Sequence, residues 1–206
     1  MKLPTHFLGH LAAFFTISVW GLTFISTKVL MNDYSPVEIM FFRLALALAV
    51  LLIASPPRPG RLDRQALRDE AAMAAAGLCG VTLFFLAQNS ALAYTLTANV
   101  SVLMSMSPLF TALASRALFN ERLKANFFLG FAAAMAGMIL VAFNGSFLLK
   151  LSPLGDLLSM LAALSWAAYS LLIKRFGGRQ GGVLCMTRKV FFYGLLFLLP
   201  ALPWLG

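Results

Sequence analysis

Long apolar stretches, separated by short polar segments, make up most of this chain. A transmembrane helix needs about 20 consecutive apolar residues to cross the hydrocarbon core. We expect one spanning helix in each of seven stretches: roughly 8–29, 36–54, 71–93, 97–119, 126–144, 154–173 and 184–205. The segments between them contain helix breakers, such as Pro56 and Pro57 after the second stretch and Gly177 and Gly178 after the sixth. The pattern predicts an all-α polytopic membrane protein.

The composition supports this fold class. The chain is 61% hydrophobic and 11% charged, whereas soluble domains are about 45–50% apolar and about 25% charged. In water such a chain would expose large apolar patches, so we expect the lipid bilayer to be its solvent. Pore-type β-barrels are excluded because their strands alternate apolar and polar residues, whereas residues 127–143 are apolar on every face.

Basic residues collect in alternate connecting segments and predict the orientation. They follow the second, fourth and sixth stretches: Arg58, Arg61, Arg64, Arg68, Arg116, Arg122, Lys124, Lys174, Arg175, Arg179, Arg188 and Lys189. The other side has only Lys28 and Lys150, at helix ends. Because cytoplasmic loops are enriched in Lys and Arg, we expect a cytoplasmic N-terminus in the plasma (inner) membrane. Without a basic surface domain, the net charge of +9 does not indicate a nucleic-acid partner.

Several residues recur at an offset of 146 positions. Gly9, Leu11, Trp20 and Lys28 recur as Gly155, Leu157, Trp166 and Lys174. Five predicted spans precede the one in which the second copy begins, so the second copy enters the membrane from the opposite side and lies upside down relative to the first. Inverted repeats are typical of secondary transporters, whose substrate sites lie between the halves. We therefore divide the chain into a first repeat, 1–146, and the start of a second, inverted repeat, 147–206.

Arg43 is the most informative single residue in the predicted spans. It lies about 10 Å deep at 1.5 Å per residue, and an arginine near a helix centre costs about 2.5–3.5 kcal/mol on insertion scales. One interpretation is that Arg43 reaches the outer interface and pairs with Glu38 or Asp33. The other is that it faces the helix bundle and helps to hold a substrate or a gate.

Other candidate pathway residues are polar or aromatic. The full set of candidates is Trp20, Arg43, Asn89, Asn99, Ser105 and Trp166. Small polar residues either form a weakly polar path or join helices by hydrogen bonds, and the tryptophans either line the pathway or pack within the bundle. Pro108 is expected to bend its helix near Met104, because proline cannot donate a hydrogen bond to the carbonyl four residues earlier.

The sequence gives no signal for an enzyme, a cofactor or a metal site. It has no Walker-type phosphate loop and no nucleophile–base pairing. Cys79 and Cys185 lack metal-ligand spacing, and we interpret them as apolar fillers. No carboxylate lies in mid-membrane, so coupling to protons through a buried acid has little support.

Several short motifs follow one another in order along the chain. They are Ser-Val-Trp-Gly-Leu-Thr-Phe at 18–24 with Lys28, Ser-Pro-Val-Glu at 35–38 with Phe42 and Arg43, Thr-Ala-Asn-Val at 97–100 with Pro108, Asn-Glu-Arg-Leu at 120–123, Gly130 with Gly137, Gly-Asp-Leu at 155–157, and Trp-Ala-Ala-Tyr at 166–169. In this order and spacing they resemble the EamA-type permeases of the drug/metabolite transporter superfamily. The resemblance covers nearly the whole chain.

The resemblance implies ten helices in two five-helix repeats around a central cavity. It also implies alternating access for small metabolites, amino acids or drugs. About two helices of the second repeat are present here, so the chain would be truncated, completed by homo-oligomerisation, or a remnant. We expect a permease that exports small organic molecules. The alternatives are a transport-incompetent fragment and a sugar- or nucleotide-type carrier of the same superfamily.

Overall fold

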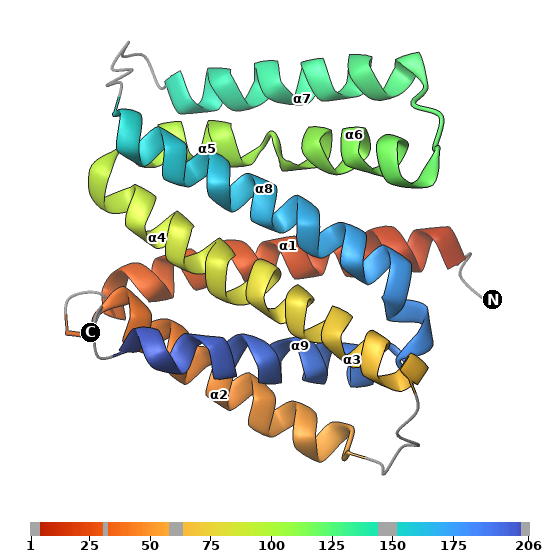
Figure 1. Ribbon diagram of the computed structural model, residues 1–206. Helices are drawn as coiled ribbons and strands as arrows, with labels where there is room; N and C mark the ends of the chain where they lie inside the picture. The colour runs from red at the N-terminus through yellow and green to blue at the C-terminus, as the bar shows by residue number, and fades with distance from the viewer. Residues whose placement is uncertain (1–4, 31–32, 58–63, 144–151, 203–206) are drawn as a thin grey trace.

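The computed structural model describes residues 5–30, 33–57, 64–143 and 152–202, and these residues form helices joined by short connections (Figure 1). Seven helical segments lie at the seven predicted positions. They are α1 (Thr5–Leu30), α2 (Pro36–Ala54), α3 (Arg64–Gly77) continued by a π-helical turn (Leu78–Leu83) and α4 (Phe84–Tyr94), α5 (Thr97–Met104) with α6 (Ser107–Phe119), α7 (Ala125–Phe143), α8 (Pro153–Phe176), and α9 (Val183–Leu198). Successive segments run in opposite directions (Figure 1).

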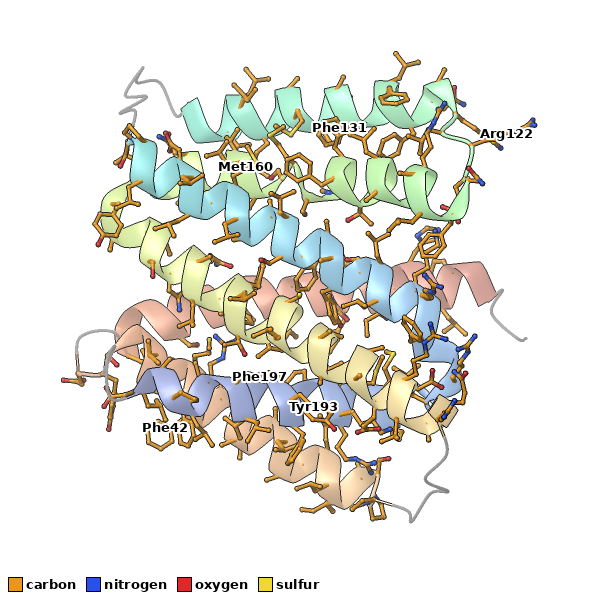
Figure 2. All side chains as sticks on the ribbon, in the orientation of Figure 1. Phe42, Arg122, Phe131, Met160, Tyr193 and Phe197 are labelled. Carbon is orange, nitrogen blue, oxygen red and sulfur yellow. The ribbon has the colours of Figure 1, made fainter. Side chains whose placement is uncertain are left out.

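The prediction of an all-α polytopic membrane protein is confirmed. Within the described ranges, five helices are long and apolar enough to cross a membrane, beginning at Val37, Arg64, Ala98, Pro153 and Val183. Two further described segments, Phe7–Thr16 and Ala125–Val141, are apolar but shorter. Large apolar side chains point outward, as Phe42 does with 61% of its surface exposed (Figure 2). In a bilayer such faces contact lipid rather than water.

Three spans extend further than their apolar stretches predict. α1 begins at Thr5 instead of residue 8, the third span begins at Arg64 instead of residue 71, and α8 continues to Phe176 instead of ending at 173. Polar side chains at the start of α3 pair along the helix, since Gln65 Nε2 donates to Asp69 Oδ1 at 2.9 Å. Charged first and last turns therefore belong to the helices, a feature that hydrophobicity alone does not reveal.

The fourth span is interrupted between α5 and α6. Ser105 and Met106 form a turn there, and Pro108 lies in the first turn of α6. Proline cannot donate to the carbonyl of Met104, four residues earlier. Just before this point, the Met106 amide donates to the Leu103 carbonyl at 3.1 Å. This bond spans three residues rather than four, as in the tighter 3₁₀ geometry. α6 is thus a separate helix from α5.

The start of α2 is fixed by a capping box. The Glu38 amide donates to Ser35 Oγ at 3.2 Å, and the Ser35 amide donates to Glu38 Oε2 at 2.8 Å. Pro36 follows as the first helical residue, where its missing amide hydrogen is not needed. Glu38, one of the two suggested partners of Arg43, is therefore engaged in this cap.

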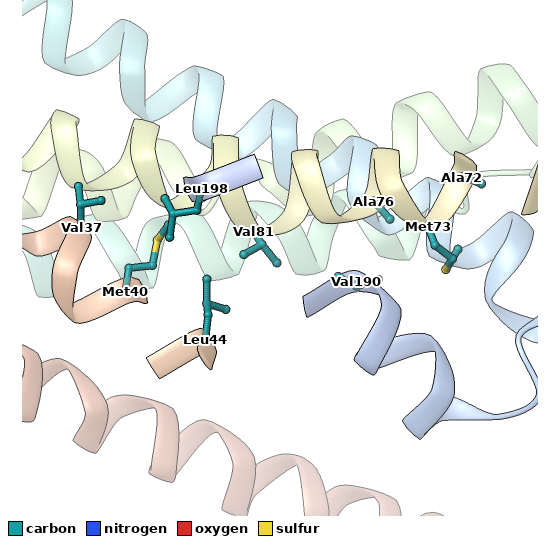
Figure 3. Packing of buried hydrophobic residues seen from close by; sticks show 9 residues of the cluster. All are labelled: Val37, Met40, Leu44, Ala72, Met73, Ala76, Val81, Val190 and Leu198. Atoms are coloured by element: carbon teal, nitrogen blue, oxygen red, sulfur yellow. The ribbon is translucent and has the colours of Figure 1, made fainter. Parts of the chain in front are cut away.

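Helices α8 and α9 lie at the centre of the packing. α8 packs against α3, α4, α5 and α6, and α9 packs against α2 and α3. The main apolar cluster consists of Val37, Met40, Leu44, Ala72, Met73, Ala76, Val81, Val190 and Leu198 (Figure 3). Two glycines allow close approach: a Cβ on Gly194 would lie 2.6 Å from Val81, and one on Gly77 would lie 2.8 Å from the Gly194 amide.

Most of the described basic side chains belong to one end of the bundle, which we call the basic end. It is formed by the last turns of α2, α6 and α8, the first turns of α3, α7 and α9, and the connections from α6 to α7 and from α8 to α9 (Figure 1). Its cations are Arg64, Arg68, Arg116, Arg122, Lys124, Lys174, Arg175, Arg179, Arg188 and Lys189. The first turns of α2 and α8, at the opposite end, carry Glu38 and Asp156.

Candidate functional site

Two grooves flank α6. The first, of about 410 Å³, lies between α6 and α8 and also touches the connection after α6; we call it the α6–α8 groove. The second, of about 540 Å³, lies between α7 and the α5–α6 break. Ser107 and Pro108 line both grooves. The interruption of the fourth span therefore borders both hollows.

The walls of the α6–α8 groove follow helical periodicity. Pro108, Thr111 and Ser115 lie at intervals of three or four residues on α6, and Trp166, Ser170 and Lys174 lie at intervals of four on α8. Such residues share one face of a helix. Lys174 contacts Ser115, so the last turns of both helices meet at the basic end.

Three polar side chains close on one another at that end of the groove. Lys174 Nζ lies 2.6 Å from Glu121 Oε1 and donates to Ser115 Oγ at 2.7 Å. Ser115 Oγ in turn donates to Glu121 Oε2 at 2.8 Å. The Lys174 ammonium also lies 5.3 Å from the centre of the Phe119 ring, within the range of a cation–π contact. Lys174, Glu121 and Ser115 are called the polar triad below.

Asn120 positions Glu121 within the polar triad. Its φ of 55° and ψ of 32° lie in the left-handed region, and they end α6 in a tight reversal. Asparagine adopts this conformation more readily than most residues. The hydrogen bonds from Lys174 and Ser115 hold the pKa of the Glu121 carboxyl below its ordinary value. The carboxylate therefore stays charged at neutral pH.

The remainder of the α6–α8 groove is aromatic and weakly polar. The Trp166 ring lies 4.8 Å from that of Phe84 and 5.2 Å from that of Tyr169, measured between centroids. Thr111 Oγ1 donates to the Ser107 carbonyl at 2.8 Å, and Ser170 Oγ donates to the Trp166 carbonyl at 2.9 Å. Each hydroxyl oxygen can still accept a hydrogen bond. The groove thus offers an apolar surface beside hydroxyls and a balanced ion pair.

Two of the six predicted pathway residues line the grooves. Trp166 lines the α6–α8 groove, Ser105 lines the second groove, and Pro108 borders both. Asn99 is buried on α5, and its Nδ2 donates to Thr95 Oγ1 at 3.2 Å. Thr95 Oγ1 donates to Asp156 Oδ1 at 3.4 Å. Asn99 thus joins a polar contact at the end opposite the basic end.

The other three candidates lie elsewhere. Asn89 is half-buried on α4, and Arg43 is exposed on α2; neither is among the residues that line the two grooves. Trp20 lies on α1, but its side chain is outside the described part of the structure. Their roles in a pathway stay predictions.

The polar triad is not predicted as a unit from the sequence. Lys174 is expected in a basic connecting segment, Glu121 enters only through the motif at 120–123, and Ser115 is not among the candidates. A signal was available, because both charges belong to ends that the basic-residue pattern places on the same side. A second polar network at the basic end was missed too: Glu70 accepts from Tyr193 at 2.8 Å and pairs with Lys189.

Comparison with known proteins identifies similar chains. Residues 7–143 match the EamA-like transporter family. The chain is 29% identical over 195 residues to an uncharacterized transporter of Archaeoglobus fulgidus, covering 93% of this chain and 65% of that protein. It is 30% identical over 164 residues to the uncharacterized transporter YyaM of Bacillus subtilis, covering 76% of this chain and 52% of that one.

A third relative has a more specific name. The chain is 26% identical over 188 residues to a probable terminal-alkyne amino-acid exporter of Streptantibioticus cattleyicolor, covering 91% of this chain and 62% of that protein. The chain therefore spans only about half to two thirds of the length of these relatives. No solved structure matches it.

Proposed function

Because the chain belongs to the EamA-like transporter family, we propose that it forms a substrate pathway of a permease that exports small organic metabolites, amino acids or drugs by alternating access. The single observation that carries the proposal is the α6–α8 groove. One wall comes from the first predicted repeat, 1–146, and the other from the second, 147–206. Secondary transporters bind substrates between their repeats.

The chemistry of the groove favours small amphipathic molecules. Trp166 supplies an aromatic face, while Thr111 and Ser170 supply hydroxyls. The charge of Lys174 is balanced by Glu121 at 2.6 Å. An anion such as a nucleotide sugar needs unbalanced positive charge to be held. The groove therefore favours the metabolite exporter over the sugar- or nucleotide-type carrier.

One relative supports amino acids among the substrates. The Streptantibioticus cattleyicolor protein is named a probable terminal-alkyne amino-acid exporter. An amino acid combines an ammonium, a carboxylate and a side chain, and the groove offers Glu121, Lys174 and Trp166 within one lining. We extend this substrate class to the present chain as one arm of the test below.

The protein is a multi-pass membrane protein, and we propose that its N-terminus and its basic end face the cytoplasm. The support is the concentration of basic residues at one end of the described bundle, including Arg116 in the last turn of α6 and Arg175 in the last turn of α8. Cytoplasmic loops collect such residues. Proteolysis of loops from one side of sealed vesicles tests the orientation.

Transport is tested with purified protein in proteoliposomes. Vesicles loaded with a radiolabelled panel of amino acids and small amphipathic drugs should lose label faster than protein-free vesicles. Trp166→Ala should slow this loss, because it removes the aromatic wall of the groove. If no compound moves at high protein density, the permease proposal fails and the transport-incompetent fragment takes its place. The mass of the purified particle, measured by light scattering, shows whether copies assemble.

A further inference from the structure

The polar triad lies where α6 and α8 come together, at the basic end of the α6–α8 groove. Lys174 belongs to the last turn of α8, and Glu121 follows the last turn of α6. Ser115 joins both partners from inside the groove lining, with distances of 2.7 and 2.8 Å. One small cluster thus connects the two walls of the groove at its basic end.

We propose that Lys174, Glu121 and Ser115 form a latch that holds the basic end of the α6–α8 groove closed, and that opening it lets α6 tilt away from α8. The inference rests on the proposed function of the same groove, because a closed end matters only if molecules pass. It assigns the latch to named side chains and gives α6 the role of the moving wall.

The structure separates this ion pair from the others at the basic end. Three ion pairs are formed among the described residues. Arg179–Asp69 and Lys189–Glu70 tie α3 to the start of α9 and its preceding connection, where α3 and α9 already pack closely. Lys174–Glu121 is the pair that joins α8 to the end of α6. Breaking it should therefore affect the groove selectively.

The latch can open and close because its two charged side chains are partly exposed to solvent. The Lys174 and Glu121 side chains keep 44% and 47% of their surface exposed, so water or a polar substrate can replace either partner. Half-exposed ion pairs hold weakly and exchange readily. A fully buried pair would instead leave an uncompensated charge on opening. The exposure is what a latch requires.

α6 can move without α5. The turn at Ser105 and Met106 interrupts the helix, so a tilt of α6 need not drag α5, which packs against α7 and α8. Beyond the other end of α6, Asn120 reverses the chain before α7 begins at Ala125. α6 is bounded by a turn at each end, as a moving segment must be.

Cysteine labelling tests the latch without transport. Ser170→Cys places a reporter in the groove, in a protein whose Cys79 and Cys185 are replaced by Ala. The full chain is reconstituted, and a membrane-impermeant maleimide is added from the side of the basic end. Lys174→Gln and Glu121→Gln should each raise the labelling rate by about fivefold, as loss of a half-exposed ion pair allows.

Two controls follow: reversal of both charges in the latch, and disruption of a different ion pair at the basic end. Lys174→Glu combined with Glu121→Lys should return the rate to that of the reporter protein. Asp69→Asn breaks the Arg179 pair at the same end and should leave the rate unchanged. Unchanged rates in both neutralised variants, no recovery in the reversed pair, or equal acceleration by Asp69→Asn would each overturn the latch.

A gentler variant covers the case in which neutralised proteins fold poorly. Ser115→Ala removes the bridging hydroxyl but keeps both charges, and it should raise the labelling rate to a smaller extent; a rate equal to that of the reporter protein overturns the role of Ser115. The two proposals fail separately. If the latch variants change the labelling rate but no compound is transported, the permease proposal is wrong. If compounds are transported but the latch variants leave the labelling rate unchanged, the latch proposal is wrong.

Discussion

Gly80 packs directly against the ring of Tyr169: a Cβ built on Gly80 would lie 2.5 Å from Tyr169 Cγ. Gly80 belongs to the π-helical turn that joins α3 to α4, and Tyr169 belongs to α8. The Tyr169 ring lies 5.2 Å from Trp166, which lines the α6–α8 groove. The absence of a side chain at Gly80 therefore leaves room for Tyr169, whose ring packs beside the Trp166 wall of the groove.

Gly80→Ala should destabilise the protein by about 1–3 kcal/mol, the usual cost of forcing extra atoms into a packed site. The clash involves the root of the Tyr169 ring, so α8 itself must shift. Gly130→Ala is the control, because a Cβ there meets nothing within 4 Å. It should be neutral or stabilising by up to about 1 kcal/mol, from helix propensity. Unfolding in mixed detergent micelles measures both, and equal effects would contradict the packing argument.

Trp166→Ala should reduce transport about 5- to 30-fold, since about 1–2 kcal/mol of aromatic contact with substrate is lost. Trp166→Phe should retain most activity, because it keeps an aromatic face. Phe192→Ala, on an exposed face of α9, should leave transport unchanged. Efflux from proteoliposomes measures all three, and a loss in the Phe192 variant as large as that in the Trp166 variant would show that the effect is not local.

Asn120→Gly should preserve the polar triad, and Asn120→Val should disrupt it. Asn120 has a φ of 55°, which glycine adopts freely and a β-branched residue adopts at a cost of about 1–2 kcal/mol. The Val variant should therefore label faster in the Ser170→Cys reporter. Identical labelling rates in the two variants would mean that the turn does not position Glu121.

The Glu121 carboxyl should titrate below the ordinary glutamate value of about 4.3, because Lys174 and Ser115 donate to it and lower its pKa. A depressed pKa in the folded state contributes stability that is present above the ordinary value and lost as pH falls through the lowered one. The chain has three glutamates, so ¹³C-carboxyl labelling with Glu121→Gln assigns the signal. Lys174→Gln should move the pKa back upward; titration of Glu121 at or above 4.3 in the unaltered protein would contradict the prediction.

The helix positions could be predicted because each span is a nearly continuous apolar run. α2 illustrates this: it begins at Pro36 and ends at Ala54, as the pattern indicates. The early start of the third span at Arg64 was not predicted, because Arg68 and Glu70 look like loop residues by hydrophobicity. Their side chains instead reach polar partners or solvent at the basic end, which costs the helix little.

The candidate site was harder to predict. Trp166 was found because an aromatic residue in a repeated motif draws attention, and Pro108 because proline breaks helices. Ser115 and Glu121 are only six positions apart, but Lys174 is 59 and 53 positions from them, and no local pattern encodes its two contacts. The π-helical turn at Leu78–Leu83 also has no clear signal, although Gly80 within it permits the close packing.

The concentration of cations at the basic end makes the molecule electrically polar along its length. An energised membrane is negative on its cytoplasmic side, and moving one elementary charge across 100 mV involves about 2.3 kcal/mol. With the basic end facing the cytoplasm, inverting the bundle would carry Arg116, Arg175 and Lys189 against that voltage as well as through lipid. In the orientation that we propose, the membrane potential therefore opposes inversion of the bundle.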